Sequence, residues 1–208
     1  MAMTHGPTLL LKIPGSGSLV YLATTNSGNN FGATFWTDGR MDAPMWPDEP
    51  PLRVHPTTRE LFWVDDCEKI TEDEDGSETE SNAVPFAVDP EAADWLQAIE
   101  TGVATTPNQL RTLLIWFWWV SNDQVRRTGR LALNRETFNR HVSRLVDVLN
   151  KDDPNDRMMA ADAARQIGQF DLANDLLSFP WSEEYETAAE RIQALTENRD
   201  PLVRTLLP

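Results

Sequence analysis

The chain has 208 residues, 40% of them apolar, and its 33 acidic and 18 basic side chains give a formal net charge of −15. A chain of this size can bury a hydrophobic core in one domain or two small ones, and its negative charge argues against binding nucleic acid or an anionic membrane surface. The single cysteine, Cys67, excludes an intramolecular disulfide and a four-cysteine zinc site. The N-terminus lacks the basic region and apolar stretch of a secretory signal, and the longest apolar run, Leu113 to Val120, is far below the roughly 20 residues that cross a bilayer, so we expect a soluble cytoplasmic protein.

Residues 1–64 are predicted to form a small, irregular β module. The stretches LLLKI, LVYLATT, ATFW and LFWV are rich in apolar, β-branched and aromatic residues, and turn-forming residues separate them. Asp38-Gly39 is a favourable pair for a tight turn, and the prolines between Pro44 and Pro51 prevent a continuous helix. These patterns indicate short strands joined by turns.

Residues 65–84 are predicted to form an acidic linker. The stretch Asp65 to Asn82 holds nine acidic residues and one lysine, with little to bury. A solvated linker is the simple interpretation, and the alternative is that its carboxylates imitate nucleic-acid phosphates toward a basic partner. The candidate partner-binding residues are Asp65, Asp66, Glu68, Glu72, Asp73, Glu74, Asp75 and the aromatic Trp46.

Residues 85–208 are predicted to form a bundle of about six helices. The pair Thr106-Pro107 marks a helix start, and LLIWFWWV, apolar on every side, predicts an enclosed helix. Apolar periodicity predicts helices over 135–149 and 183–197. Small residues with a turn at Gly168 predict a close helical hairpin at 155–179, similar to one tetratricopeptide unit. The fold class is therefore α+β.

The charge of the predicted bundle differs from that of the whole chain. Residues 105–151 contain eight basic and three acidic side chains. One further alternative is therefore that the acidic stretch folds back onto this basic region.

The stretch SGNNFGATFWTDGRMDAPMWPDEP, followed by LFWVDD, resembles bacterial proteins that begin with a zinc ribbon and continue with helical repeats. In that family two Cys-Pro-x-Cys knuckles hold the zinc. Here Ile13-Pro14-Gly15-Ser16 and His55-Pro56-Thr57-Thr58 stand at those positions, and only His55 keeps a zinc-binding side chain. The resemblance implies a ribbon-like module without metal, in which we expect apolar packing around Ile13 to replace the ion.

No catalytic pattern is evident in the sequence. Gly15 to Ser18 predicts a turn, and the carboxylates around Cys67 should raise its pKa. His141 is expected at an exposed or edge position rather than as a general base, because no catalytic partner for it can be named. Metalloprotease, phosphate-loop and dinucleotide motifs are missing from the sequence. We therefore expect a protein with neither enzymatic activity nor a cofactor.

The leading hypothesis for function is an immunity protein that neutralises a basic bacterial toxin, such as a nuclease effector, by covering its active site. It rests on the acidity, the lack of catalytic patterns and the resemblance to a bacterial family. The alternative is a general interaction adaptor or regulator on a helical-repeat scaffold. The sequence leaves the oligomeric state open.

Overall fold

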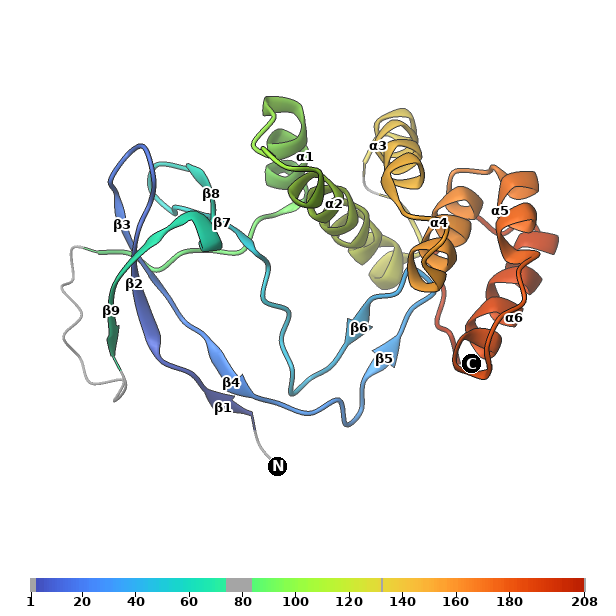
Figure 1. The fold of residues 1–208 in the computed structure, drawn as a ribbon, viewed down its shortest axis with the longest axis horizontal. Coiled ribbons are helices and arrows are strands. Elements are labelled where there is room, and N and C mark those ends of the chain that lie inside the picture. Colours follow the sequence, from blue (N-terminus) through green and yellow to red (C-terminus); the bar gives the residue numbers. More distant parts are fainter. Residues whose placement is uncertain (1–2, 74–83, 132, 208) are drawn as a thin grey trace. The chain divides into compact units, whose positions relative to one another are not determined.

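The computed structural model describes residues 3–73, 84–131 and 133–207 and has the mixed α+β character expected from the sequence (Figure 1). The chain divides into two compact units. The first unit comprises residues 1–33 and 42–103, and the second comprises residues 34–41 and 104–208. We call residues 34–41 the tongue, because this segment interrupts the first unit in sequence but belongs to the second.

The first unit is built on a three-stranded antiparallel sheet. Strand β2 (Thr8–Lys12) lies in the middle, with β3 (Leu19–Leu22) on one side and β9 (Glu68–Asp73) on the other. Two further strand pairs belong to this unit: β1 (Thr4–His5) with β4 (Thr25–Ser27), and β7 (Leu52–Val54) with β8 (Leu61–Trp63). Its helices are a 3₁₀ helix (Val64–Asp66) and α1 (Ala92–Thr101).

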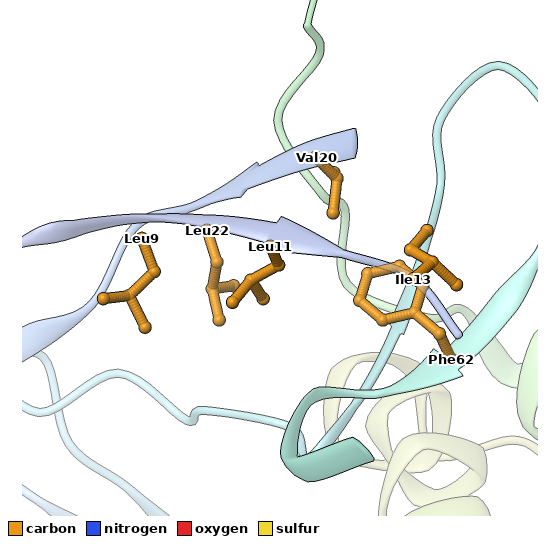
Figure 2. Close-up of a cluster of buried hydrophobic side chains, with 6 residues drawn as sticks. All are labelled: Leu9, Leu11, Ile13, Val20, Leu22 and Phe62. Atoms are coloured by element: carbon orange, nitrogen blue, oxygen red, sulfur yellow. The ribbon is translucent and has the colours of Figure 1, made fainter. Parts of the chain in front are cut away.

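One apolar cluster lies against this sheet (Figure 2). Side chains alternate between the two faces of a strand, so Leu9, Leu11 and Ile13 lie on the same side of the chain. All three are buried, and Ile13 is 2% exposed. The remaining members of the cluster are Val20, Leu22 and Phe62. The expectation that Ile13 is buried in apolar packing is confirmed, and each such side chain contributes about 1.5–3 kcal/mol to folding.

Part of the predicted acidic linker is a strand. Residues 68–73 pair with β2, for example Leu10 with Thr71, although acidic side chains dominate this stretch. The strand provides backbone hydrogen bonds for the edge of β2 that β3 leaves open, and Ile70 and Thr71 are favourable strand residues. Residues 74–83 lie outside the described part of the chain.

Helix α1 belongs to the first unit, whereas the sequence grouped it with the helical bundle from residue 85. Asp94 of α1 accepts hydrogen bonds from Arg59 Nη2 at 2.5 Å and from the Glu91 amide at 2.9 Å. The indole of Trp63 donates to the Val103 carbonyl at 3.2 Å. These long-range contacts place the boundary between the units after Val103.

In the part that the structure describes, the second unit contains five helices, each packed on the next (Figure 1). Thr106 caps the first of them by accepting from the Gln109 amide at 3.2 Å, and Gly168 takes the left-handed conformation in the predicted hairpin turn, with φ of 84°. No helix within the described ranges combines the length and hydropathy that a bilayer crossing needs. The helices are α2 (Pro107–Thr128), α3 (Arg135–Val148), α4 (Pro154–Gln166), α5 (Phe170–Leu177) and α6 (Glu183–Glu197).

Helix α2 is less enclosed than the sequence predicted. Phe117 and Trp118 are fully buried, but Trp116 and Trp119 are only partly covered. The helix packs on α3 and on the tongue, and its Trp118 donates to Gln166 of α4 at 2.9 Å, yet one side of the helix stays partly exposed. The apolar run in the sequence therefore predicted more burial of α2 than the structure has.

The tongue is a short hairpin whose tip lies among the helices of the second unit. Its strands are β5 (Thr34–Phe35) and β6 (Met41–Asp42), and the Trp36 amide donates to the Arg40 carbonyl at 2.9 Å. The tight turn predicted at Asp38-Gly39 is present, and Gly39 has φ of 80°. Unexpectedly for a turn residue, Asp38 is 0% exposed.

Three groups on α2 hold Asp38. The Arg126 guanidinium forms an ion pair with its carboxylate, and Asn122 Nδ2 donates to the same carboxylate oxygen at 2.8 Å. The Trp119 indole donates to the Asp38 carbonyl at 2.9 Å. Because an isolated buried carboxylate is very unfavourable, these bonds determine where the tongue can dock.

The end of the chain secures the other side of the tongue. The Thr37 amide donates to the Arg204 carbonyl at 2.8 Å, and the Leu206 amide donates to the Phe35 carbonyl at 2.9 Å. On α4, Arg165 is fully buried and donates to the Leu202 carbonyl at 3.0 Å. The tongue is thus held between α2 and the final segment of the chain.

We expect Asp38→Asn to lower the free energy of unfolding by about 3 kcal/mol, because it leaves the buried guanidinium of Arg126 without one of its two counterions. Urea unfolding followed by far-ultraviolet circular dichroism measures this loss. The control is Asp147→Asn, which neutralises an exposed carboxylate on α3 and should cost less than about 0.5 kcal/mol. Equal, small effects of the two substitutions would contradict the role given to the ion pair.

Candidate protein-interaction surface

The acidic residues predicted to bind a partner do not all fall within the described structure. Asp65 and Asp66 lie in the 3₁₀ helix and are exposed. Glu68 begins β9 and forms an exposed ion pair with Lys12 at 3.0 Å. The backbone of Glu72 and Asp73 continues β9, and Glu74 and Asp75 lie outside the described residues. The described acids therefore line a strand and a helical turn rather than a free linker.

Trp46, the aromatic residue predicted to contact a partner, lies in a local structure that brings two distant loops together. Asn29 and Met45 form an antiparallel bridge, in which the Asn29 amide donates to the Met45 carbonyl at 3.3 Å. The side-chain oxygen of Asn29 accepts from the Phe31 amide at 2.9 Å. The Trp46 amide donates to the Ala43 carbonyl at 3.1 Å.

Glycine at position 28 permits this close approach. A Cβ atom added to Gly28 would lie 2.2 Å from the Met45 carbonyl oxygen, which is far inside van der Waals contact. A second bond between the same loops joins the Thr25 amide to Glu49 Oε1 at 2.8 Å. The two loops are therefore fixed to each other by backbone pairing.

The paired loops display three large apolar side chains, which we call the apolar patch: Phe31, Met45 and Trp46. Phe31 is 84% exposed, Trp46 is 52% exposed and Met45 is 39% exposed. Single exposed apolar residues are common, but a group held on paired backbone is typical of a binding surface. Of the three, only Trp46 was predicted from the sequence, because the pairing of the two loops joins Asn29 and Met45, which are 16 positions apart.

The charge around the apolar patch is negative. Between Lys12 and Arg53 the sequence of the first unit contains no basic residue, whereas Asp42, Asp48 and Glu49 flank Trp46. Over its whole sequence the first unit has four basic and seventeen acidic side chains. A partner for this surface would therefore combine an apolar recess with a basic rim.

The two positions compared with zinc knuckles form turns with the same hydrogen bonds. The Ile13 amide donates to the Ser18 carbonyl at 2.9 Å, and the His55 amide donates to the Glu60 carbonyl at 2.9 Å. Each turn also has a second backbone hydrogen bond. The Gly17 amide donates to the Ile13 carbonyl at 3.0 Å, and the Arg59 amide donates to the His55 carbonyl at 2.9 Å. Both Gly17 and Arg59 have positive φ, of 71° and 60°.

The side chains in these turns do not form a zinc site. Ile13 and His55 are buried, whereas Ser16 and Thr58 are exposed. His55 Nδ1 already accepts from the Thr58 amide at 3.2 Å and lies 3.3 Å from the Thr57 amide. Among the described residues no group of three or more histidine, cysteine or acidic side chains is arranged to hold a metal ion. The His55 side chain therefore stabilises its own turn.

The buried polar groups around Asp38 are closed to solvent. Burial raises the pKa of the Asp38 carboxyl, although the Arg126 charge and the Asn122 hydrogen bond act in the opposite direction. The side chains of Asp38 and Arg126 are 0% and 4% exposed, so a substrate has no access to them in this structure. Their arrangement is suited to holding the tongue. From the sequence, Asp38 was predicted only as a turn residue. The one signal of its burial was its place two residues after Trp36, within the motif of residues 27–50.

His141 is buried, which corrects the expectation of an exposed or edge position. It is 6% exposed and packs edge-on against Phe117 at 5.3 Å between ring centroids. His141 follows Phe138 by three residues on α3 and therefore shares its inward face. The position of His141 therefore indicates that its side chain packs in the core of the bundle.

Comparisons with known protein families, with curated proteins and with solved structures found no significant match.

Cys67 has an unreactive environment, as the sequence suggested. Burial, followed by the charges of Asp66 and Glu60, raises the pKa of the Cys67 thiol to about 11. The sequence argument named only the acidic neighbours, whereas burial is the larger cause. The thiol also lies 3.3 Å from the Trp63 carbonyl, to which it donates.

We expect Cys67 in the folded protein to react with iodoacetamide at least about a hundredfold more slowly than in the urea-unfolded chain at the same pH. A pKa of about 11, against an ordinary value of 9.0, leaves about a hundredfold less thiolate, which is the reacting form. Mass spectrometry of timed samples measures both rates. Rates within a few-fold of each other would show that this environment does not suppress the thiolate.

Proposed function

We propose that this protein is a non-enzymatic binding protein that holds a basic partner protein on its first unit. The apolar patch carries this proposal, because it places Phe31 and Trp46 on paired backbone within a strongly acidic unit. Tryptophan is enriched among the residues that contribute most to protein interfaces, and the burial of such an anchor accounts for much of the affinity. Opposite charge on the two partners speeds their encounter and limits binding to the wrong partner.

The most concrete form of the proposal is an immunity protein that covers the active site of a basic toxin. A toxin that acts on nucleic acid needs a basic surface, and the exposed carboxylates of Asp65 and Asp66 offer the charge that such a surface attracts. The apolar patch would add affinity that does not depend on salt. The protein would then need no catalytic groups of its own.

The matching turns at residues 13–18 and 55–60 support the resemblance to zinc-ribbon proteins. Both keep a proline at the second position and the same pair of backbone hydrogen bonds. In this proposal the first unit is a ribbon-like module in which Ile13 and Phe62 pack where a metal would otherwise organise the turns.

A general interaction adaptor is the alternative function. It is supported by the close packing of α4 against α5, where Ala160, Ala161 and Ala164 are completely buried, as in one tetratricopeptide-like hairpin. Such hairpins bind partners through stacked repeats, of which about three are needed. The adaptor reading therefore assigns binding to the second unit rather than to the apolar patch.

We expect Trp46→Ala and Phe31→Ala each to weaken capture of the basic partner by at least about 30-fold, because removal of an anchor at the centre of an interface costs about 2 kcal/mol or more. Affinity purification from the native host, followed by titration of the purified partner, measures the effect. The matched control is Leu207→Ala, which truncates an apolar side chain of the second unit that is 63% exposed. Stability should change by less than about 0.5 kcal/mol in all three variants.

The salt dependence and the variants together separate the two functions. A stoichiometric basic partner that is lost at high salt and in the Trp46 variant supports binding at the patch. If the partner is a toxin, co-expression should restore growth with the native chain but not with the Trp46 variant. A partner that binds all the variants equally would refute the proposal and favour the adaptor reading.

A further inference from the structure

A polar cleft lies in the second unit between α3 and the turn that joins α4 to α5. Its volume is about 570 Å³, within the roughly 300–1,000 Å³ typical of small-molecule sites. Among the described residues that line it, Ile167 is the one apolar residue. The polar lining residues are Arg135, Glu136, Asn139, Arg140, Ser143 and Gln169.

Helix α3 presents these side chains on a face that the core does not use. Arg135, Asn139 and Ser143 follow one another at intervals of four residues, so they lie along one side of the helix. The core side is separate and includes Phe138 and Val142, which are at most 1% exposed. The two sides meet at Arg135, whose guanidinium lies over the Phe138 ring at 5.8 Å from its centroid.

The cleft is positively charged where it meets solvent. Two guanidinium groups, of Arg135 and Arg140, face one carboxylate, that of Glu136. Arg135 makes one long hydrogen bond to the Gln166 carbonyl, at 3.4 Å. For Arg140 no hydrogen bond or ion pair is found within the described ranges. Both groups retain N–H donors suited to a phosphate or carboxylate.

The neutral groups of the cleft can bind hydroxyl groups. Asn139 Oδ1 is enclosed and has no hydrogen-bond partner in the part of the chain that the structure describes. Gln169 is the N-cap residue of α5, but its side chain makes no capping bond. An enclosed acceptor without a donor is unfavourable, and rotation of the Asn139 side chain toward the cleft would let a ligand O–H satisfy this oxygen.

We propose that this cleft binds a small phosphorylated polyol of the sugar-phosphate class. The arginines would hold the phosphate, and Asn139, Ser143 and Glu136 would bind its hydroxyl groups. The lining residues that the structure describes include no aromatic side chain, which makes a flat nucleobase a poorer match. The site is independent of the apolar patch, because all of its residues belong to the second unit.

Calorimetric titration of the full chain with ribose 5-phosphate tests the proposal, with ribose and inorganic phosphate as separate probes. We expect a Kd for ribose 5-phosphate below about 1 mM, no binding of ribose, and binding of inorganic phosphate weaker by at least about tenfold. Arg140→Gln should weaken binding of the sugar phosphate by at least about tenfold, since it removes a charged donor. Arg144→Gln, on the same helix but outside the cleft lining, should leave binding unchanged.

A second variant guards against a loss that reflects unfolding. Asn139→Asp should also weaken binding by at least about tenfold, because its carboxylate, one helical turn from Arg135, would offset the positive charge that holds the phosphate, while circular dichroism shows that each variant keeps its helices. No binding of ribose 5-phosphate, or the same affinity in the Arg140 and Arg144 variants, would overturn the proposal. Equal affinity for inorganic phosphate and ribose 5-phosphate would overturn it as well and indicate an adventitious ion only.

Discussion

The buried ion pair between Asp38 and Arg126 is the constraint on which the arrangement of the second unit depends. A carboxylate with 0% exposure must be matched by donors, and α2 supplies them from Asn122 and Arg126, with the Trp119 indole on the adjacent carbonyl. Arg126 is matched in turn by Asp123 at 2.6 Å. Because these donors and acceptors meet when the tongue lies on α2, they favour this position of the tongue in the bundle.

The same constraint gives a physical meaning to the family-like motif of residues 27–50. Its middle part is the tongue, with Trp36 beneath the guanidinium of Arg126 at 5.2 Å. Its outer parts are the paired loops that carry Phe31 and Trp46. One continuous motif therefore serves two units, which explains why it is longer than a β hairpin requires. The acidity is also divided, since the second unit has sixteen acidic side chains against fourteen basic ones and is close to neutral.

Local patterns in the sequence predicted much of this structure. The cap at Thr106, the left-handed Gly168 and the apolar stripe of α3 depend on neighbours a few residues away, and they located the helices correctly. The errors involve partners distant in sequence. Strand β9 forms because β2 offers it an edge, and α1 joins the first unit through Arg59 and Asp94. From composition alone, β9 was predicted as part of an acidic linker and α1 as part of the helical bundle. For the candidate surface, Trp46 could be named from its type, but the pairing of its loop with the loop that carries Phe31 depends on the bridge between Asn29 and Met45.

Amide hydrogen exchange of the tongue tests the central claim most directly. The amides of Trp36, Thr37 and Gly39 donate to carbonyls in the hairpin or in the C-terminal segment at 2.8–3.0 Å. If the ion pair holds the tongue in the bundle, these three amides should be protected to nearly the same extent as the central amides of α2 and α4, because all of them open only when the second unit unfolds. Fast exchange in the tongue while α2 and α4 stay protected would contradict the account.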